Sequence, residues 1–162
     1  MTLRTFAEID LDHPPELAFA VIIRPRTIPM AFQGAGPIPG TVHAEVLGDG
    51  VMRPGARRVV RASDGTSVHE VIEELVAPSR QRYTLSGFSR PFSWLVRAGE
   101  GCWTLSPVGA GTHVRWDFSF LLTTVLAWPV VVLLLHVWFR RAMVQALGRI
   151  REAVGREAVG VG

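Results

Sequence analysis

The stretch FLLTTVLAWPVVVLLLHVWFRRA, residues 120–142, decides how the whole chain is interpreted. It carries no formal charge up to Phe139, and Arg140 and Arg141 follow directly. Taken alone, a long uncharged stretch with a basic end is typical of a membrane anchor. In its context, the same stretch can be the start of a long helix that covers an apolar pocket. The residues on either side discriminate between these two interpretations.

The residues before this stretch alternate strictly between apolar and polar side chains. One face carries Val114, Trp116, Phe118 and Phe120, and the other carries His113, Arg115, Asp117 and Ser119. A period of two predicts a β-strand with one buried face and one solvated face. The first five residues of the quoted stretch therefore belong to a strand, and the sheet they join needs a cover.

The remaining apolar residues, 126–139, are too few for a membrane span. A span needs about 20 apolar residues, whereas 10–14 are typical of a buried helix. Pro129 disfavours a helical Trp128 and predicts a helix start at about Pro129. His136 would lie unpaired in mid-span, which is costly in lipid. We predict a covering helix, and a contact of residues 126–139 with a membrane surface or a second copy stays open.

The segment after Phe139 is amphipathic. Apolar residues recur at a spacing of three and four, which defines one helical face: Met143, Leu147, Ile150 and Val154. Glycines in the tail predict fraying from about Gly155. We therefore expect a single domain over residues 1–155 and a flexible tail over residues 156–162.

The rest of the chain indicates mainly strands. Residues 3–11 predict a first strand, and two short helices follow at residues 15–23 and 26–32. The connector GAGPIPG, residues 34–40, has the wrong glycine spacing for a dinucleotide-binding loop. From residue 41 to 123 the turn signals separate six strands, which predicts an antiparallel meander.

Composition excludes several functional classes. The chain has 162 residues, of which 48% are hydrophobic and 19% charged, with a net charge of +3. Its 17 basic residues are all arginine, and acidic residues are interleaved with them, so we expect no nucleic-acid partner. Cys102 is the only cysteine, and the histidines lack zinc-ligand spacing, so no disulfide, metal or cofactor is predicted. The N-terminus lacks the apolar core of a signal peptide, and a cytoplasmic location is expected.

Several segments in this order resemble the START-like SRPBCC superfamily, most closely its polyketide cyclase/dehydrase group. They are PGARRVVRASDG (54–65), HEVIEEL (69–75), YTLSG (83–87), WTLSP (103–107), GAGTHVRWDFSF (109–120) and FRRAMVQALGRIRE (139–152). The resemblance implies an α+β helix-grip fold. In that fold a curved antiparallel sheet of seven strands wraps a long C-terminal helix and leaves a hydrophobic cavity between them.

The alternation of the strands predicts which side chains face this cavity. On the concave face we expect Val42, Ala44, Val46, Val60, Val68, Glu70, Ile72, Glu74, Tyr83, Leu85, Trp103, Leu105, Val114, Trp116 and Phe118. Trp94 could stand at the cavity mouth, and His136 could project into the cavity from the helix. The predicted ligand-binding residues are Arg58, Glu70, Ile72, Tyr83, Trp94, Trp103, Trp116, Phe118 and His136. Plain core packing is the alternative for each aromatic residue.

Glu70 is the most informative polar residue. A buried carboxylate must be paired, hydrogen-bonded or protonated, and Arg58 on the adjacent strand is its expected partner. Glu70, Tyr83 and His136 are candidates for proton transfer, and a purely structural ion pair is the alternative for Glu70. We predict a protein that binds a small hydrophobic molecule, such as a lipid, sterol or polyketide. The alternative is an enzyme of the polyketide cyclase/dehydrase type.

Overall fold

A computed structural model of the chain, which describes residues 1–160, contains one seven-stranded antiparallel sheet. The strands lie in the order β1-β9-β8-β7-β6-β5-β4. Their bounds are β1 Thr2–Leu11, β4 Thr41–Val46, β5 Arg57–Ala62, β6 Ser67–Val76, β7 Arg80–Ser86, β8 Val96–Val108 and β9 Gly111–Leu122. β1 pairs with β9 although they are far apart in sequence, and β4 to β9 form the predicted meander.

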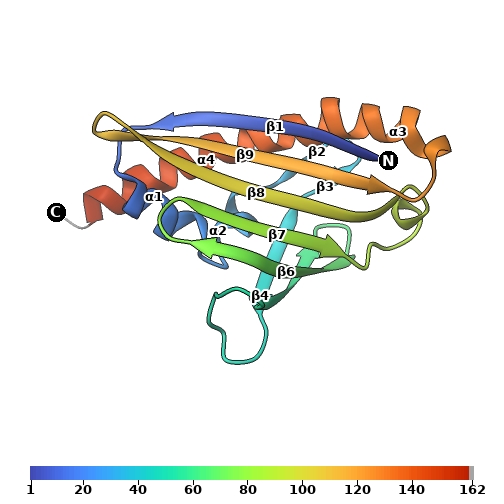
Figure 1. The fold of residues 1–162 in the computed structure, drawn as a ribbon, viewed down its shortest axis with the longest axis horizontal. Helices are drawn as coiled ribbons and strands as arrows, with labels where there is room; N and C mark the ends of the chain where they lie inside the picture. Colours follow the sequence, from blue (N-terminus) through green and yellow to red (C-terminus); the bar gives the residue numbers. More distant parts are fainter. Residues whose placement is uncertain (161–162) are drawn as a thin grey trace.

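The helices gather on one face of this sheet (Figure 1). After β1 come α1 (Pro15–Ile22), α2 (Thr27–Ala31) and a small hairpin of β2 (Gly34–Ala35) and β3 (Ile38–Pro39). This hairpin occupies the segment that was expected to be a simple connector. The remaining helical turns are η1 (Phe92–Trp94), η2 (Val125–Ala127), α3 (Trp128–Leu133), the π-helical η3 (Leu134–Phe139) and α4 (Arg140–Gly160). The prediction of an α+β helix-grip fold is therefore confirmed.

The core lies between the concave face of the sheet and the long helix. The four apolar residues of β9, from Val114 to Phe120, are all buried, as the alternation predicts. The helical face from Met143 to Val154 is also buried. Two amphipathic patterns with different periods thus bury their apolar sides against each other.

The elements η2, α3, η3 and α4 form one continuous helix. By length and composition, Val125–Gly160 could span a membrane, but 39% of its most apolar window is buried inside the fold. Thr124 caps its start and accepts a hydrogen bond from the Leu126 amide. Helical structure begins slightly before Pro129, which lies in the first turn of α3, where a missing N–H is tolerated.

The C-terminal end of the helix also differs from the expected fraying. The helix continues beyond Gly155 as far as Gly160. Glu157 in this last part forms an ion pair with Arg24 at 2.7 Å, which ties the helix to the segment after α1. The flexibility of the predicted tail, 156–162, stays a prediction, and residues 161–162 lie outside the described part.

Two bulges correct the predicted concave face. In β4 the register shifts between Thr41 and His43, which leaves Val42 58% exposed. In β6 the register shifts between Ile72 and Glu74, so Glu74 points outward and forms ion pairs with Arg80 and Arg82. A bulge inserts one residue that is left unpaired, and it interrupts the regular alternation of inward and outward side chains at that point. The predictions that Val42 and Glu74 face the cavity are therefore wrong.

Candidate functional site

A cavity of about 410 Å³ lies between the sheet and its helical cover. The sheet contributes apolar side chains to it: Ala44, Val60, Val68, Leu85, Phe118 and Phe120. The β3 residue Ile38, the η1 residue Phe92 and the η3 residue Leu134 close it from other sides. The exposed residues Pro37, Asp64 and Arg90 also line it, so three loops form its rim. A largely apolar cavity of this size is typical of small-molecule sites.

Three aromatic side chains form the floor of the cavity. Trp103 and Trp116, from the neighbouring strands β8 and β9, stack with their ring centroids 4.3 Å apart. The Nε1–H of Trp116 donates a hydrogen bond to the Tyr83 hydroxyl at 3.1 Å. That hydroxyl donates to no acceptor among residues 1–160, and Tyr83 lines the cavity. A ligand oxygen in the cavity could therefore accept a hydrogen bond from the Tyr83 O–H.

Two glycines in β8 make room for these rings. Gly101 lies directly opposite Tyr83 in the β7–β8 register, and a Cβ at Gly101 would overlap the Tyr83 ring. A Cβ at Gly99 would lie 3.2 Å from Cζ of Phe118. Both positions have ordinary extended backbone, so the glycines are needed for space and not for conformation. A glycine inside a strand is the signal that could have predicted this close approach.

Arg58 and Glu70 form a buried ion pair at the cavity wall. They are opposite each other in the β5–β6 register, and Arg58 Nη2 lies 2.5 Å from Glu70 Oε1. The two side chains are only 6% and 4% exposed. The Nε–H of Arg58 is buried without a hydrogen-bond partner among residues 1–160. The pair therefore retains an unused donor beside the cavity.

Burial shifts the acid–base properties of this wall. Burial raises the pKa of Glu70, and the Arg58 guanidinium opposes that rise. Burial, followed by the neighbouring Glu70 charge, also raises the pKa of Tyr83, so its hydroxyl stays neutral. The wall thus combines a cation, a carboxylate that binds a proton more readily than usual, and a neutral hydroxyl.

Most of the predicted site residues meet at this cavity. It is lined by Arg58, Glu70, Tyr83, Trp103, Trp116 and Phe118. Ile72 is fully buried in the core but does not line the cavity. Trp94 of η1 is exposed to solvent, although its sequence neighbours Phe92 and Leu95 line the cavity. Gln81 was missed: it is buried in the lining, and its spacing of two from Tyr83 could have predicted it.

The prediction that His136 projects into the cavity is wrong. The imidazole is exposed, because the π-helical turn η3 directs Leu135 and Phe139 inward. Leu135 and Phe139 are four residues apart and lie on the inner side of the helix. His136, the residue after Leu135, lies on the outer side. His113, which was expected to face solvent, lies on the outer face of β9 and contacts Asp10 at 2.7 Å and Glu8 at 2.9 Å.

A curved antiparallel sheet that grips a long helix around an apolar cavity defines the helix-grip class of ligand-binding folds. Residues 3–155 match the family model described as polyketide cyclase / dehydrase and lipid transport. The chain therefore belongs to this family, as its resemblance to the SRPBCC superfamily predicted. No match is found among the curated proteins.

Solved structures confirm the fold. Norcoclaurine synthase of Thalictrum flavum, a point mutant in complex with a transition-state analogue, is similar with a TM-score of 0.73 at 13% identity, covering 98% of this chain and 97% of that chain. A Mesorhizobium loti protein has a TM-score of 0.71 at 16% identity, with 95% and 98% covered. The di-domain aromatase/cyclase BexL of the BE-7585A biosynthetic pathway has a TM-score of 0.64 at 16% identity, with 93% and 49% covered. At these identities the likeness shows the fold alone.

Proposed function

We propose that the protein binds a small hydrophobic, ring-containing molecule of the lipid, sterol or polyketide type in this cavity. The observation that carries the proposal is an apolar cavity of about 410 Å³ with one buried ion pair in its wall. Apolar walls supply affinity and a few polar groups supply orientation in such sites. The description of the family, which combines cyclases, dehydrases and lipid transport, agrees with this class of ligand.

Each side of the cavity has a role in this proposal. Rings of the ligand pack against the stacked pair Trp103 and Trp116. A carbonyl or hydroxyl oxygen of the ligand accepts a hydrogen bond from the Tyr83 hydroxyl or from Arg58. Both donors are buried, and a ligand without such an oxygen leaves them unpaired, so the site favours molecules that carry one.

Native mass spectrometry of the purified full chain tests this proposal. The expected result is a mass excess that organic extraction removes and that identifies a hydrophobic compound. The variant Ala44→Trp fills the cavity from β4, and it should purify without the extra mass. Val42→Trp is the matched control, because Val42 lies two residues away on the outer side. An equal mass excess on both variants would place the compound outside the cavity.

A second candidate function is catalysis of a polyketide cyclase or dehydrase reaction in the same cavity. The raised pKa of Glu70 beside the neutral Tyr83 favours it, because the two groups suit proton transfer. Glu70 would remove a proton from a carbon next to a carbonyl, and Tyr83 would donate a hydrogen bond to the carbonyl oxygen. Glu70→Gln should then bind a short poly-β-keto compound without converting it, whereas Glu74→Gln, on the outer side, should leave turnover unchanged.

The expected external contact of residues 126–139 and the cytoplasmic location stay proposals. The structure leaves Leu126, Val130 and Leu133 exposed in that segment, which supports a contact with a membrane surface or a second copy. Cell fractionation of the tagged full chain, with and without high salt, measures both together.

A further inference from the structure

The outer side of the long helix carries an exposed apolar stripe near its N-terminal end. The stripe repeats at spacings of three and four residues, and it consists of Leu126, Val130, Leu133 and Val137. Leu126 is 84% exposed. The opposite side of the same helix is buried in the core through Ala127, Val131, Leu135 and Phe139. Apart from the exposed His136, this part of the helix is thus apolar all round, although only one side is covered.

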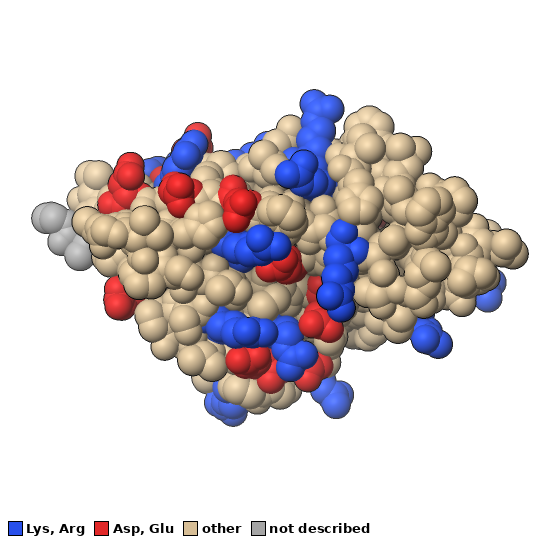
Figure 2. Space-filling view, turned by 45° about the horizontal axis from the view of Figure 1, so that its top comes forward, with Lys and Arg blue, Asp and Glu red and all other residues tan. Residues whose placement is uncertain are grey.

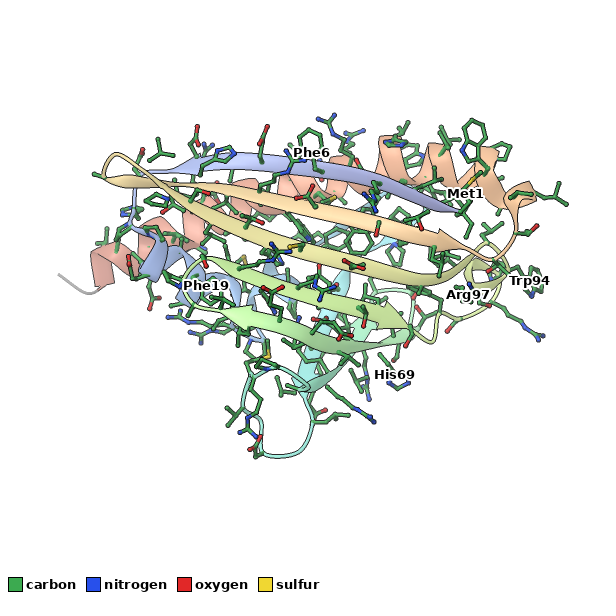
Figure 3. All side chains as sticks on the ribbon, viewed as in Figure 1. Met1, Phe6, Phe19, His69, Trp94 and Arg97 are labelled. Carbon is green, nitrogen blue, oxygen red and sulfur yellow. The ribbon has the colours of Figure 1, made fainter. Side chains whose placement is uncertain are left out.

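Further apolar side chains extend the stripe at the same end of the molecule. Trp94 and Met1, both exposed, lie at that end in Figure 3. The chain just before the helix holds them there: the Thr123 amide donates to the Leu95 carbonyl, and the Leu122 amide donates to the Met1 carbonyl. Val125 and Trp128 are also exposed. Together, Met1, Trp94, Val125, Leu126, Trp128, Val130, Leu133 and Val137 form what we call the apolar tip.

The charges around the apolar tip are of one sign. Residues 118–151 and 75–99 contain no aspartate or glutamate. Exposed arginines flank the tip in these segments: Arg90, Arg97, Arg140 and Arg141. Figure 2 shows the end of the molecule at the right as a surface without acidic side chains, bordered by basic ones.

From this combination we propose that the apolar tip docks on the surface of an anionic lipid bilayer. An interfacial helix inserts an apolar face among the acyl chains while basic residues contact anionic headgroups. Tryptophans such as Trp94 and Trp128 are favoured at that boundary. The inner side of the helix stays in the core, so the protein docks on the bilayer without spanning it.

The charge pattern disfavours a second copy of the chain as the occupant. In a two-fold contact the same surface patch meets itself. The arginines around one tip would then face the arginines of the other tip, with no carboxylate in the flanking segments to pair with them. Like charges brought together across an interface are unfavourable, whereas anionic headgroups complement them.

Docking would also bring the cavity close to the bilayer. Phe92 and Leu95, on either side of Trp94, line the cavity, and so does Leu134 of η3. A hydrophobic molecule could therefore pass between the bilayer and the cavity along a short path. The docking itself concerns the outer surface, and it is expected whether or not the cavity binds a ligand.

Co-sedimentation of the full chain with large vesicles tests the proposal. Vesicles of phosphatidylcholine with about a third phosphatidylserine should sediment the protein, and vesicles of phosphatidylcholine alone should sediment much less. Leu126→Ser with Leu133→Ser should weaken binding about tenfold or more, because two exposed leucines lose their apolar contact. The control is Val51→Ser with Val159→Ser, which changes two exposed valines outside the tip.

A second pair of variants separates the charge contribution. Arg97→Gln with Arg141→Gln should weaken binding about thirtyfold at low salt, since each arginine near the surface contributes about 1 kcal/mol and about 1.4 kcal/mol is a factor of ten. Arg57→Gln with Arg61→Gln removes the same charge from exposed positions on β5 and should have little effect.

Three results would overturn the proposal. The first is a wild-type chain that stays in solution with the anionic vesicles. The second is equal vesicle binding by the serine variant and its control. The third is a dimer in analytical ultracentrifugation that Leu126→Ser with Leu133→Ser dissociates, together with no vesicle binding by the wild type. That result would assign the tip to a second copy of the chain.

Discussion

The buried pair of Arg58 and Glu70 allows a test in which the two partners behave differently. Replacing Glu70 by leucine leaves the guanidinium charged at a site where the side chain is only 6% exposed. Removal of one partner of a buried pair costs about 3–5 kcal/mol. In a chain of this size, that loss lowers the midpoint of thermal unfolding by about 6–20 °C. Arginine cannot lose its proton, so the loss should persist at every pH at which Glu70 of the wild type is ionised.

Replacing Arg58 by methionine should have a cost that depends on pH. Without the guanidinium, burial alone acts on Glu70 and raises its pKa further above its ordinary value of 4.5. A folded-state pKa above the unfolded one stabilises the protein fully below the unfolded pKa, and this stabilisation is lost as the pH rises through the folded pKa. The methionine variant should therefore be more stable in mildly acidic than in alkaline buffer, relative to wild type.

Urea unfolding followed by tryptophan fluorescence measures these differences. The double variant, with methionine at 58 and leucine at 70, should recover most of the stability, because a buried pair and an apolar replacement are about equal in energy. A cost below about 1 kcal/mol for the Glu70 variant, or the same pH profile for both single variants, would refute the reasoning.

Three further predictions concern neighbouring features. Tyr83→Phe should lower the free energy of unfolding by about 1–3 kcal/mol, because the buried Trp116 N–H loses its acceptor, and an unchanged urea midpoint would contradict this. Gly101→Ala should destabilise the fold by about 1–3 kcal/mol through the overlap with Tyr83, whereas Gly148→Ala, with open space in α4, should stabilise it. Hydrogen bonds to Asp10 and Glu8 of β1 raise the pKa of His113. The resulting stabilisation is fully present below about pH 6.5 and is lost as the pH rises through the folded-state pKa. His113→Gln should remove this pH dependence from the free energy of unfolding.

The sequence was most informative where two periodicities meet. The strict alternation from His113 to Phe120 and the helical spacing from Met143 to Val154 predicted the strand, the helix and the faces they bury. These patterns are strong because each residue contributes to the same buried face. Interpreting residues 120–142 as a strand followed by a gripped helix was correct for that reason.

The errors arose where the backbone departs from its regular period. Bulges in β4 and β6 reversed the facing of Val42 and Glu74, and a bulge has no reliable sequence signal. A π-helical turn placed His136 outside, because it changes the phase of the helix by part of a turn. The Arg58–Glu70 pair was predicted because both residues lie beyond these irregularities in a regular part of the β5–β6 register.

Fluorescence titration with the uncharged ring probe N-phenyl-1-naphthylamine tests the central claim, a ligand-binding cavity between sheet and helix, most directly. We predict saturable binding of one probe molecule to wild type and to the outer-face variant Val42→Trp, and none at the same concentration to the cavity-filling variant Ala44→Trp. Circular dichroism would verify that each variant is folded. Equal binding of the probe by the folded Ala44→Trp and Val42→Trp variants would contradict the claim.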